Sequence, residues 1–127
     1  MILVDSDVLI AHLRGDERAR DWLRATRRKE QLVTSVVCVA EITGGMRSAE
    51  RTAVWRLLSA LGPVPVTELI AQRAGDLMRQ YRRSHSGIGL GDYLIAATAE
   101  TQSAHLATLN VRHFPMFPEL RPPFASE

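Results

Sequence analysis

The sequence has a single cysteine and no long hydrophobic run. One cysteine in 127 residues cannot form an intramolecular disulfide, and Cys38 lies in an apolar segment, where we expect it to pack as a small hydrophobic residue. No stretch approaches the roughly 20 apolar residues of a membrane span. The N-terminus meets Asp5 and Asp7 at once, without a preceding basic segment, which excludes a signal peptide. We therefore expect a soluble cytoplasmic protein that folds without disulfides.

Lysine is almost absent as well. Lys29 is the only one among 16 basic residues, which stand against 14 acidic residues and leave a net charge of +2. So weak a net charge permits a polyanionic partner without indicating one, because the local distribution of the positive charge then decides whether a polyanion binds. Two clusters, at 24–29 and 79–83, concentrate the positive charge. Each is either a solvated helix face or a site for phosphates.

Short apolar runs alternate with helical patterns along the chain. The runs that predict strands are Met1–Val4, Leu32–Thr34, Val64–Val66 and His105–Leu109, with an edge strand near Leu120 in the proline-rich tail. The predicted helices run from a cap at Ser6 or Asp7 to Gly15, over Asp16–Lys29, from a cap at Ser35 to Gly45, over Ser48–Leu61, from a cap at Thr67 to the loop His85–Gly91, and from a cap at Asp92 through Ala99. This alternation predicts one α/β domain, residues 1–127, with a mostly parallel sheet covered on both faces.

Three carboxylates and one amide occupy apolar surroundings near element ends. Asp5 ends the first strand, Glu41 lies inside a helix, Asp92 opens a buried helix, and Asn110 ends the last strand. In open α/β sheets, ligands bind outside the carboxyl ends of the strands. Acids gathered there raise each other's pKa unless a cation neutralises them, and oxygen ligands favour Mg²⁺ or Mn²⁺. Taken alone, Asp92 can equally be only a helix cap and Asp5 only a turn residue.

Four segments also resemble a known family. VDSDVLI at 4–10, Ser35 and Glu41 as S-x₅-E, GDYLIAATA at 91–99 and ATLNVRHF at 107–114 are similar to the PIN-domain nucleases, and more narrowly to VapC-type toxins of bacterial VapBC toxin–antitoxin modules. The resemblance implies an α/β/α sandwich with a central parallel sheet and a Mg²⁺- or Mn²⁺-dependent endoribonuclease. By motif position, Asp5, Glu41 and Asp92 correspond to the core metal-binding acids. Asn110 stands where many members carry a fourth acid, and a neutral amide attracts a second metal less.

The resemblance has further implications for mechanism and partners. One or two divalent ions would activate water to attack a phosphate of RNA, leaving 5′-phosphate and 3′-hydroxyl ends, and the arginine clusters would hold flanking phosphates. It also implies a homodimer, and inhibition by a VapB-type antitoxin lying across helices. The segment Val36–Leu61, with Trp55, is the predicted antitoxin groove.

Four residues within these motifs each have more than one possible role. We favour Asp7 as a helix cap, and Thr108 either orients a ligand or is an ordinary strand threonine. Arg112 and His113 either contact RNA or anchor the turn, so neither enters the predicted catalytic set.

Two other functions fit parts of the sequence. The D-x-D of Asp5 and Asp7 also occurs in haloacid-dehalogenase-like phosphatases, but these use a later lysine, and Lys29 comes too early. A catalytically silent module with the PIN fold, binding RNA or a protein, is the other alternative. The presence of all three acids argues against it, because crowded unpaired carboxylates are costly without a metal.

Overall fold

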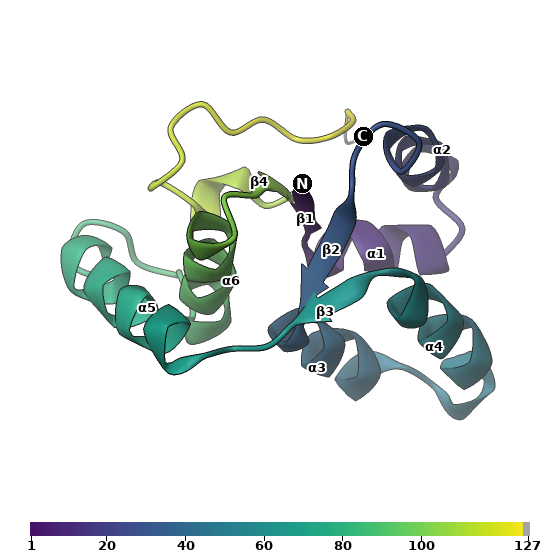
Figure 1. Cartoon of the computed structure of the whole chain (residues 1–127), viewed down its shortest axis with the longest axis horizontal. Coiled ribbons are helices and arrows are strands. Elements are labelled where there is room, and N and C mark those ends of the chain that lie inside the picture. The colour runs from purple at the N-terminus through teal and green to yellow at the C-terminus, as the bar shows by residue number, and fades with distance from the viewer. Residues whose placement is uncertain (126–127) are drawn as a thin grey trace.

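Four parallel strands form the centre of the protein. The computed structural model describes residues 1–125, and in it the strands lie in the order β3-β2-β1-β4 (Figure 1). Their bounds are Ile2–Val4 for β1, Leu32–Ser35 for β2, Gly62–Val64 for β3 and His105–Ala107 for β4. In the register, Leu3 of β1 is paired with Val33 on one side and with Leu106 on the other. The predicted parallel sheet is thereby confirmed, and β1 lies in its interior.

Helices cover both faces of this sheet. α5 and α6 lie together on one side, and α1, α2 and α4 lie on the other (Figure 1). The helices are α1 Ser6–Leu13, α2 Glu17–Thr26, α3 Val36–Gly45, α4 Arg51–Ala60, α5 Glu68–Tyr81 and α6 Leu90–Thr101, with short 3₁₀ turns η1 Ser48–Glu50 and η2 Val111–His113. This is the predicted three-layer α/β/α sandwich.

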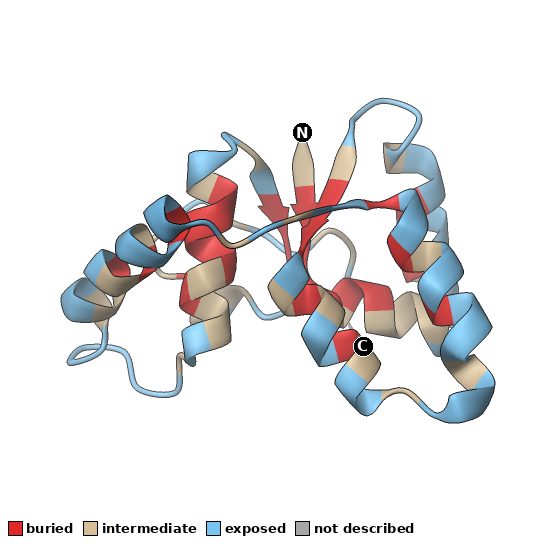
Figure 2. Cartoon of the chain, turned by 60° about the horizontal axis from the view of Figure 1, so that its bottom comes forward, coloured by how far each residue is buried: buried red, intermediate tan, exposed pale blue. Residues whose placement is uncertain are grey.

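The apolar core is divided between the two faces. Leu3 packs with residues of α5 and α6, whereas the next residue, Val4, packs with residues of α1 and α4, because successive side chains of a strand point to opposite faces. Buried residues therefore gather in the strands and on the inner sides of the helices (Figure 2). As predicted from its apolar sequence, α6 is buried on several sides, and Ala96 and Ala97 are fully inaccessible. Among the described residues, no helix is long and apolar enough to cross a membrane.

Two predicted helix caps were misplaced. Asp92 is not the N-cap of α6, because the helix begins at Leu90 and Gly89 is its N-cap; the Asp92 carboxylate, at the third helical position, closes a capping box by accepting from the Gly89 N–H at 3.1 Å. The N-cap of α1 is Asp5 rather than Ser6 or Asp7, since its Oδ1 accepts from the Ser6 N–H at 2.7 Å. Ser35 and Thr67 cap α3 and α5 as predicted.

Several predicted bounds were also wrong. β3 lies two residues earlier than Val64–Val66, because Pro63 is tolerated on an edge strand that pairs on one side only. β4 stops at Ala107, and the Leu109 N–H donates to Asp7 instead of continuing the sheet. The residues of 48–50 form η1 before α4 begins. In the described tail, Leu120 belongs to no strand, and its N–H closes a turn onto the Phe117 carbonyl.

Candidate active site

Asp5 lies at the carboxyl end of the central strand and is buried. Its Oδ1 accepts from the Ser6 N–H, and its Oδ2 accepts from the hydroxyl of Thr108 at 2.8 Å. Burial raises the pKa of Asp5 to about 6, and the charge of Asp7 adds to this shift. The two hydrogen bonds act in the opposite direction. The carboxylate is thus held in one orientation in surroundings that penalise its charge.

Glu41 reaches the same place from α3. Its Oε1 accepts a 3.0 Å hydrogen bond from the Ser6 hydroxyl, so Ser6 contacts both acids. One oxygen each of Asp5 and Glu41, with the Cys38 sulfur, lie within 4.8 Å of one another. The pKa of Glu41 is raised, first by desolvation and then by the charges of Asp5 and Asp92.

Asp92 approaches this pair from the first turn of α6. Besides the Gly89 N–H, its Oδ2 has a second partner, His113 Nδ1, at 3.0 Å. Nδ1 donates to this carboxylate in the ring form in which it carries the hydrogen. A Cβ added at Gly91 would lie 3.6 Å from Glu41 Oε2, which shows how closely the start of α6 approaches Glu41. Asp92 accordingly raises the pKa of both other acids.

Asn110 lies at the margin of the site. It is exposed, its Nδ2 lies 2.8 Å from His113 Nδ1, and its N–H donates to the Thr108 hydroxyl. It therefore contacts Asp92 through His113. The structure brings Asp5, Glu41 and Asp92 together as the sequence predicted, and places Asn110 beside them.

Asp7 is a fourth carboxylate at this edge, and sequence reasoning underrated it. Its Oδ2 accepts from the Leu109 N–H at 3.0 Å and lies 3.2 Å from the Thr108 hydroxyl. Its Oδ1 is buried and has no hydrogen-bond partner among the described residues. Desolvation raises the pKa of Asp7. The available sequence signal was its position two residues after Asp5, because two acids at positions i and i+2 at the end of a strand lie close together.

Cys38 is fully buried, as predicted, but it also contacts the site. Its Sγ lies 3.8 Å from Asp5 Oδ1. Burial raises the pKa of this thiol to about 12, and the charge of Asp5 adds to the shift. A thiol that stays protonated is a poor metal ligand, since the thiolate is the form that binds metals. The ligand set at this edge is therefore made of oxygen atoms.

The donor atoms fit a divalent cation. Across residues 1–125, no lysine or arginine forms an ion pair with Asp5, Asp7, Glu41 or Asp92, and the histidine at 113 is the basic partner of Asp92. The raised pKa values of Asp5, Asp7 and Glu41 and the unpartnered Asp7 oxygen indicate a site that lacks positive charge. Hard carboxylate oxygens in this arrangement suit Mg²⁺ or Mn²⁺.

Comparisons with known proteins agree with this geometry. The sequence model of the family described as PIN domain matches residues 2–117. Ribonuclease VapC10 of Mycobacterium tuberculosis is 67% identical over 125 residues, which cover 98% of this chain and 94% of VapC10. Ribonuclease VapC19 of the same organism is 44% identical, with coverage of 98% and 100%. A toxin–antitoxin complex from Klebsiella pneumoniae has a chain of similar structure, with a TM-score of 0.82, 25% identity and 98% coverage of both chains.

Proposed function

We propose that this chain, which belongs to the PIN-domain family and is the VapC-type ribonuclease toxin of a type II toxin–antitoxin system, cuts RNA with a divalent cation held by Asp5, Glu41 and Asp92. The observation that carries the proposal is the meeting of these carboxylates at the carboxyl edge of the sheet: ligand atoms of Asp5 and Glu41 lie within 4.8 Å of each other, and the charge of Asp92 acts on both. None of the three has a lysine or arginine partner in residues 1–125. When bound, Mg²⁺ or Mn²⁺ would activate water and neutralise charge on the phosphate. Asn110 would complete the ligand set through its amide oxygen.

The neighbours of the acids orient them for this role. The Ser6 N–H and the Thr108 hydroxyl fix Asp5, and the Ser6 hydroxyl fixes Glu41. The Gly89 N–H and His113 fix Asp92. Ligands held by such partners keep their geometry when a cation binds, which contributes to affinity and activity.

Two arginine clusters differ in their position relative to this edge. Arg82 and Arg83 are exposed and directly follow the last residue of α5, at the start of the segment that leads to Asp92. In this proposal they would hold phosphates that flank the cut. Arg24 and Arg27, by contrast, precede β2 and so lie toward the opposite edge of the sheet. RNA binding should therefore weaken with salt mainly through Arg82 and Arg83.

Cleavage of total bacterial RNA by the antitoxin-free protein tests the proposed function. The reactions contain Mg²⁺, Mn²⁺ or EDTA, and Asp92→Asn is compared with the wild type. Asparagine can still accept from the Gly89 N–H but lacks the charge that a metal ion needs. We expect discrete cuts that require metal and disappear in Asp92→Asn. Absence of cleavage with either metal would support the silent binding module, and cleavage by Asp92→Asn would refute the assigned site.

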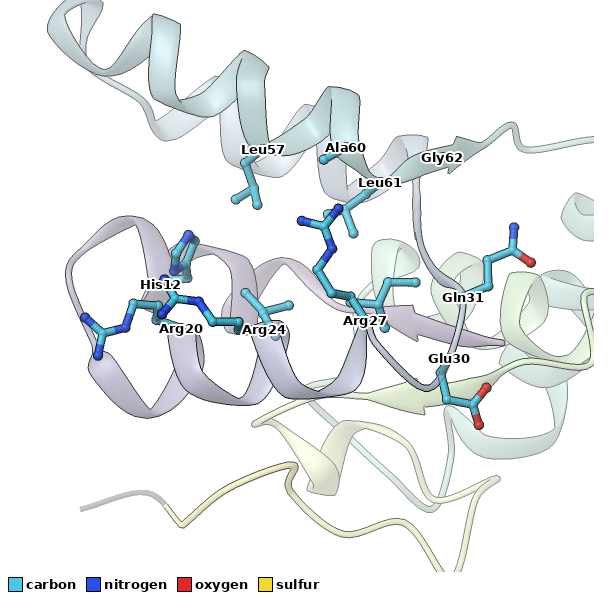
Figure 3. A pocket seen from close by; sticks show the side chains of 12 residues that line it. His12, Arg20, Arg24, Arg27, Glu30, Gln31, Leu57, Ala60, Leu61 and Gly62 are labelled. Carbon is cyan, nitrogen blue, oxygen red and sulfur yellow. The ribbon is translucent and has the colours of Figure 1, made fainter.

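A groove of mixed polar and apolar lining between α2 and α4 is our candidate for the antitoxin site. It has a volume of about 480 Å³, with Leu23 and Leu57 among its apolar residues, and Arg24 and Arg27 on its α2 side (Figure 3). Neither arginine forms an ion pair among the described residues. An amphipathic helix with acidic residues beside its apolar face would suit this lining. The Klebsiella complex, which contains a toxin and an antitoxin, supports such a partner.

This placement differs from the one expected at Trp55. Trp55 is 43% exposed on α4 but is not among the residues that line the groove. Two variants separate the alternatives by their affinity for the cognate antitoxin. If the groove binds it, Leu57→Glu weakens binding at least tenfold and Trp55→Ala does not. The opposite result would place the antitoxin at Trp55, on the outer side of α4.

Three further predictions complete the proposal. Exposed Leu69 and Leu90, at 65% and 60%, would contribute to a homodimer, which sedimentation of the antitoxin-free protein can measure.

A single domain over 1–127 is supported by the family match to 2–117, although residues 126 and 127 lie outside the described part of the chain. RNA as the substrate supports action in the cytoplasm.

A further inference from the structure

A second groove begins at the candidate active site itself. It lies between α1, the end of α3 and the start of α4, with a volume of about 240 Å³. Ile10, Leu13, Met46 and Val54 supply an apolar lining, and these residues belong to the core on that face of the sheet. Glu41 lines the groove as well. The same carboxylate therefore belongs both to the acid cluster and to the wall of this groove.

The charges around this groove suit a nucleic acid strand. Arg14 and Arg47 line it, both are exposed, and the Arg47 side chain is 90% accessible. The acid Glu50 also lines the groove, and its Oε1 accepts from the Arg47 N–H at 2.8 Å and lies 3.9 Å from Arg47 Nε. A strand entering the groove would thus meet Arg14, which forms no ion pair among the described residues, and the exposed Arg47 beside an apolar floor. Cations hold phosphates, and apolar or planar surfaces hold unstacked bases.

We propose that this groove receives the base of one unstacked RNA nucleotide next to the phosphate that is cut. The inference rests on the proposed ribonuclease function and deepens it, because it assigns substrate selection to a place in the fold. Because Glu41 belongs to the acid cluster and also lines the groove, the two sites adjoin. A phosphate bound at the acids therefore leaves the base of the adjoining nucleotide within reach of the groove. Met46 supplies a polarizable and adaptable contact for the base, while Arg14 and Arg47 hold the backbone.

Two neighbouring glycines allow the groove to be filled without disturbing the acids. Gly45, the last residue of α3, lines the groove, and a Cβ added there would meet no atom within 4 Å. Gly44 has equally open surroundings but is not among the lining residues. Gly45→Leu therefore places a side chain in the groove, and Gly44→Leu is its matched control. Thermal unfolding checks that both variants are folded.

The probes are oligoribonucleotides that span a cut site mapped in total RNA with the wild-type protein. In each oligonucleotide one nucleotide near the cut is replaced by an abasic residue. For the wild type, we expect an abasic residue at one flanking position to lower kcat/KM about tenfold. Gly45→Leu should lower kcat/KM about tenfold for the intact RNA and leave the abasic RNA unaffected. Gly44→Leu should match the wild type on both.

Other results would overturn this inference in distinguishable ways. If Gly45→Leu lowers kcat/KM equally for intact and abasic RNA, the substitution acts on the acids and not on a base. If it changes neither RNA but weakens inhibition by the cognate antitoxin, the groove binds protein. Both results leave the ribonuclease function intact, provided that the wild type cuts and Asp92→Asn does not. A wild type that cuts no RNA would remove both the function and the groove's role.

Discussion

His113 Nδ1 lies 3.0 Å from Asp92 Oδ2, and this contact joins the turn after β4 to the first turn of α6. The ring is partly buried, and Asn110 lies on the same nitrogen, at 2.8 Å. Two segments that arrive separately at the sheet edge are thereby locked together. His113, which was left out of the predicted catalytic set, therefore acts as a positioning residue for Asp92.

His113→Ala should weaken metal binding. Without the ring, Asp92 loses its side-chain partner and can turn away from the other acids, so we expect the affinity for Mn²⁺ in calorimetry to fall about tenfold or more. His105→Ala is the matched control, because His105 is exposed at the opposite end of β4. Equal Mn²⁺ affinities in His113→Ala and the wild type would refute this role.

Thr108→Val should reduce both stability and cleavage. The Thr108 hydroxyl lies 2.8 Å from Asp5 Oδ2 and accepts from the Asn110 N–H, so its removal leaves buried polar groups unpaired, at a cost of about 1–3 kcal/mol in the free energy of unfolding. Thr98→Val is the control, since that buried hydroxyl donates within α6 to the Leu94 carbonyl. Urea unfolding and cleavage rates measure the effects. If Thr98→Val impaired cleavage as much as Thr108→Val, a specific role for Thr108 would be wrong.

Cys38 should be unreactive in the folded protein and dispensable for metal binding. Its pKa of about 12 keeps the thiol protonated, and burial blocks access. We expect iodoacetamide to modify it only after unfolding, and Cys38→Ser to bind Mn²⁺ as the wild type does. Rapid modification of the native protein, or loss of Mn²⁺ binding in Cys38→Ser, would instead identify the sulfur as a ligand.

Asp5 should make the metal-free protein less stable as the pH rises. Its pKa is about 6 in the folded protein against an ordinary value of 3.8, so between these values the folded state binds more protons than the unfolded state. The free energy of unfolding then falls as the pH increases through this window. Asp5→Asn removes the effect.

Chemical denaturation in EDTA measures this difference. From about pH 4 to pH 7, the stability of Asp5→Asn should increase relative to the wild type by up to about 3 kcal/mol. Saturating Mg²⁺ should abolish the trend, because the cation favours the ionised carboxylate. A difference that stays constant with pH in EDTA would show that Asp5 ionises normally.

The sequence predicted the layers of this fold because they depend on local patterns. Short apolar runs separated by amphipathic helices indicate a parallel sheet, and the caps at Ser35 and Thr67 were correct because a side-chain oxygen preceded an apolar helix. The misplaced bounds had tertiary causes. Leu109 has a strand-like sequence, but its N–H is taken by Asp7, more than a hundred positions earlier in the chain.

The acids of the candidate site were also predictable, whereas their partners were not. Asp5, Glu41 and Asp92 stood out as carboxylates in apolar segments, a local signal. The contacts of Ser6 with Glu41 and of Thr108 with Asp5 join residues distant in sequence, and small hydroxyl side chains give no pattern that marks such a role. The role of His113 was equally unpredictable, because its contact with Asp92 depends on where α6 begins.

The ends of the cleaved RNA test the central claim most directly. If the acids hold a cation that activates water, the products carry 5′-phosphate and 3′-hydroxyl groups, and a substrate with a 2′-O-methyl group at the cut site is still attacked at the same bond. Mass spectrometry of the fragments distinguishes these ends. Fragments ending in 2′,3′-cyclic phosphate would show that the RNA's own 2′-hydroxyl is the nucleophile, and would contradict the role assigned to Asp5, Glu41 and Asp92.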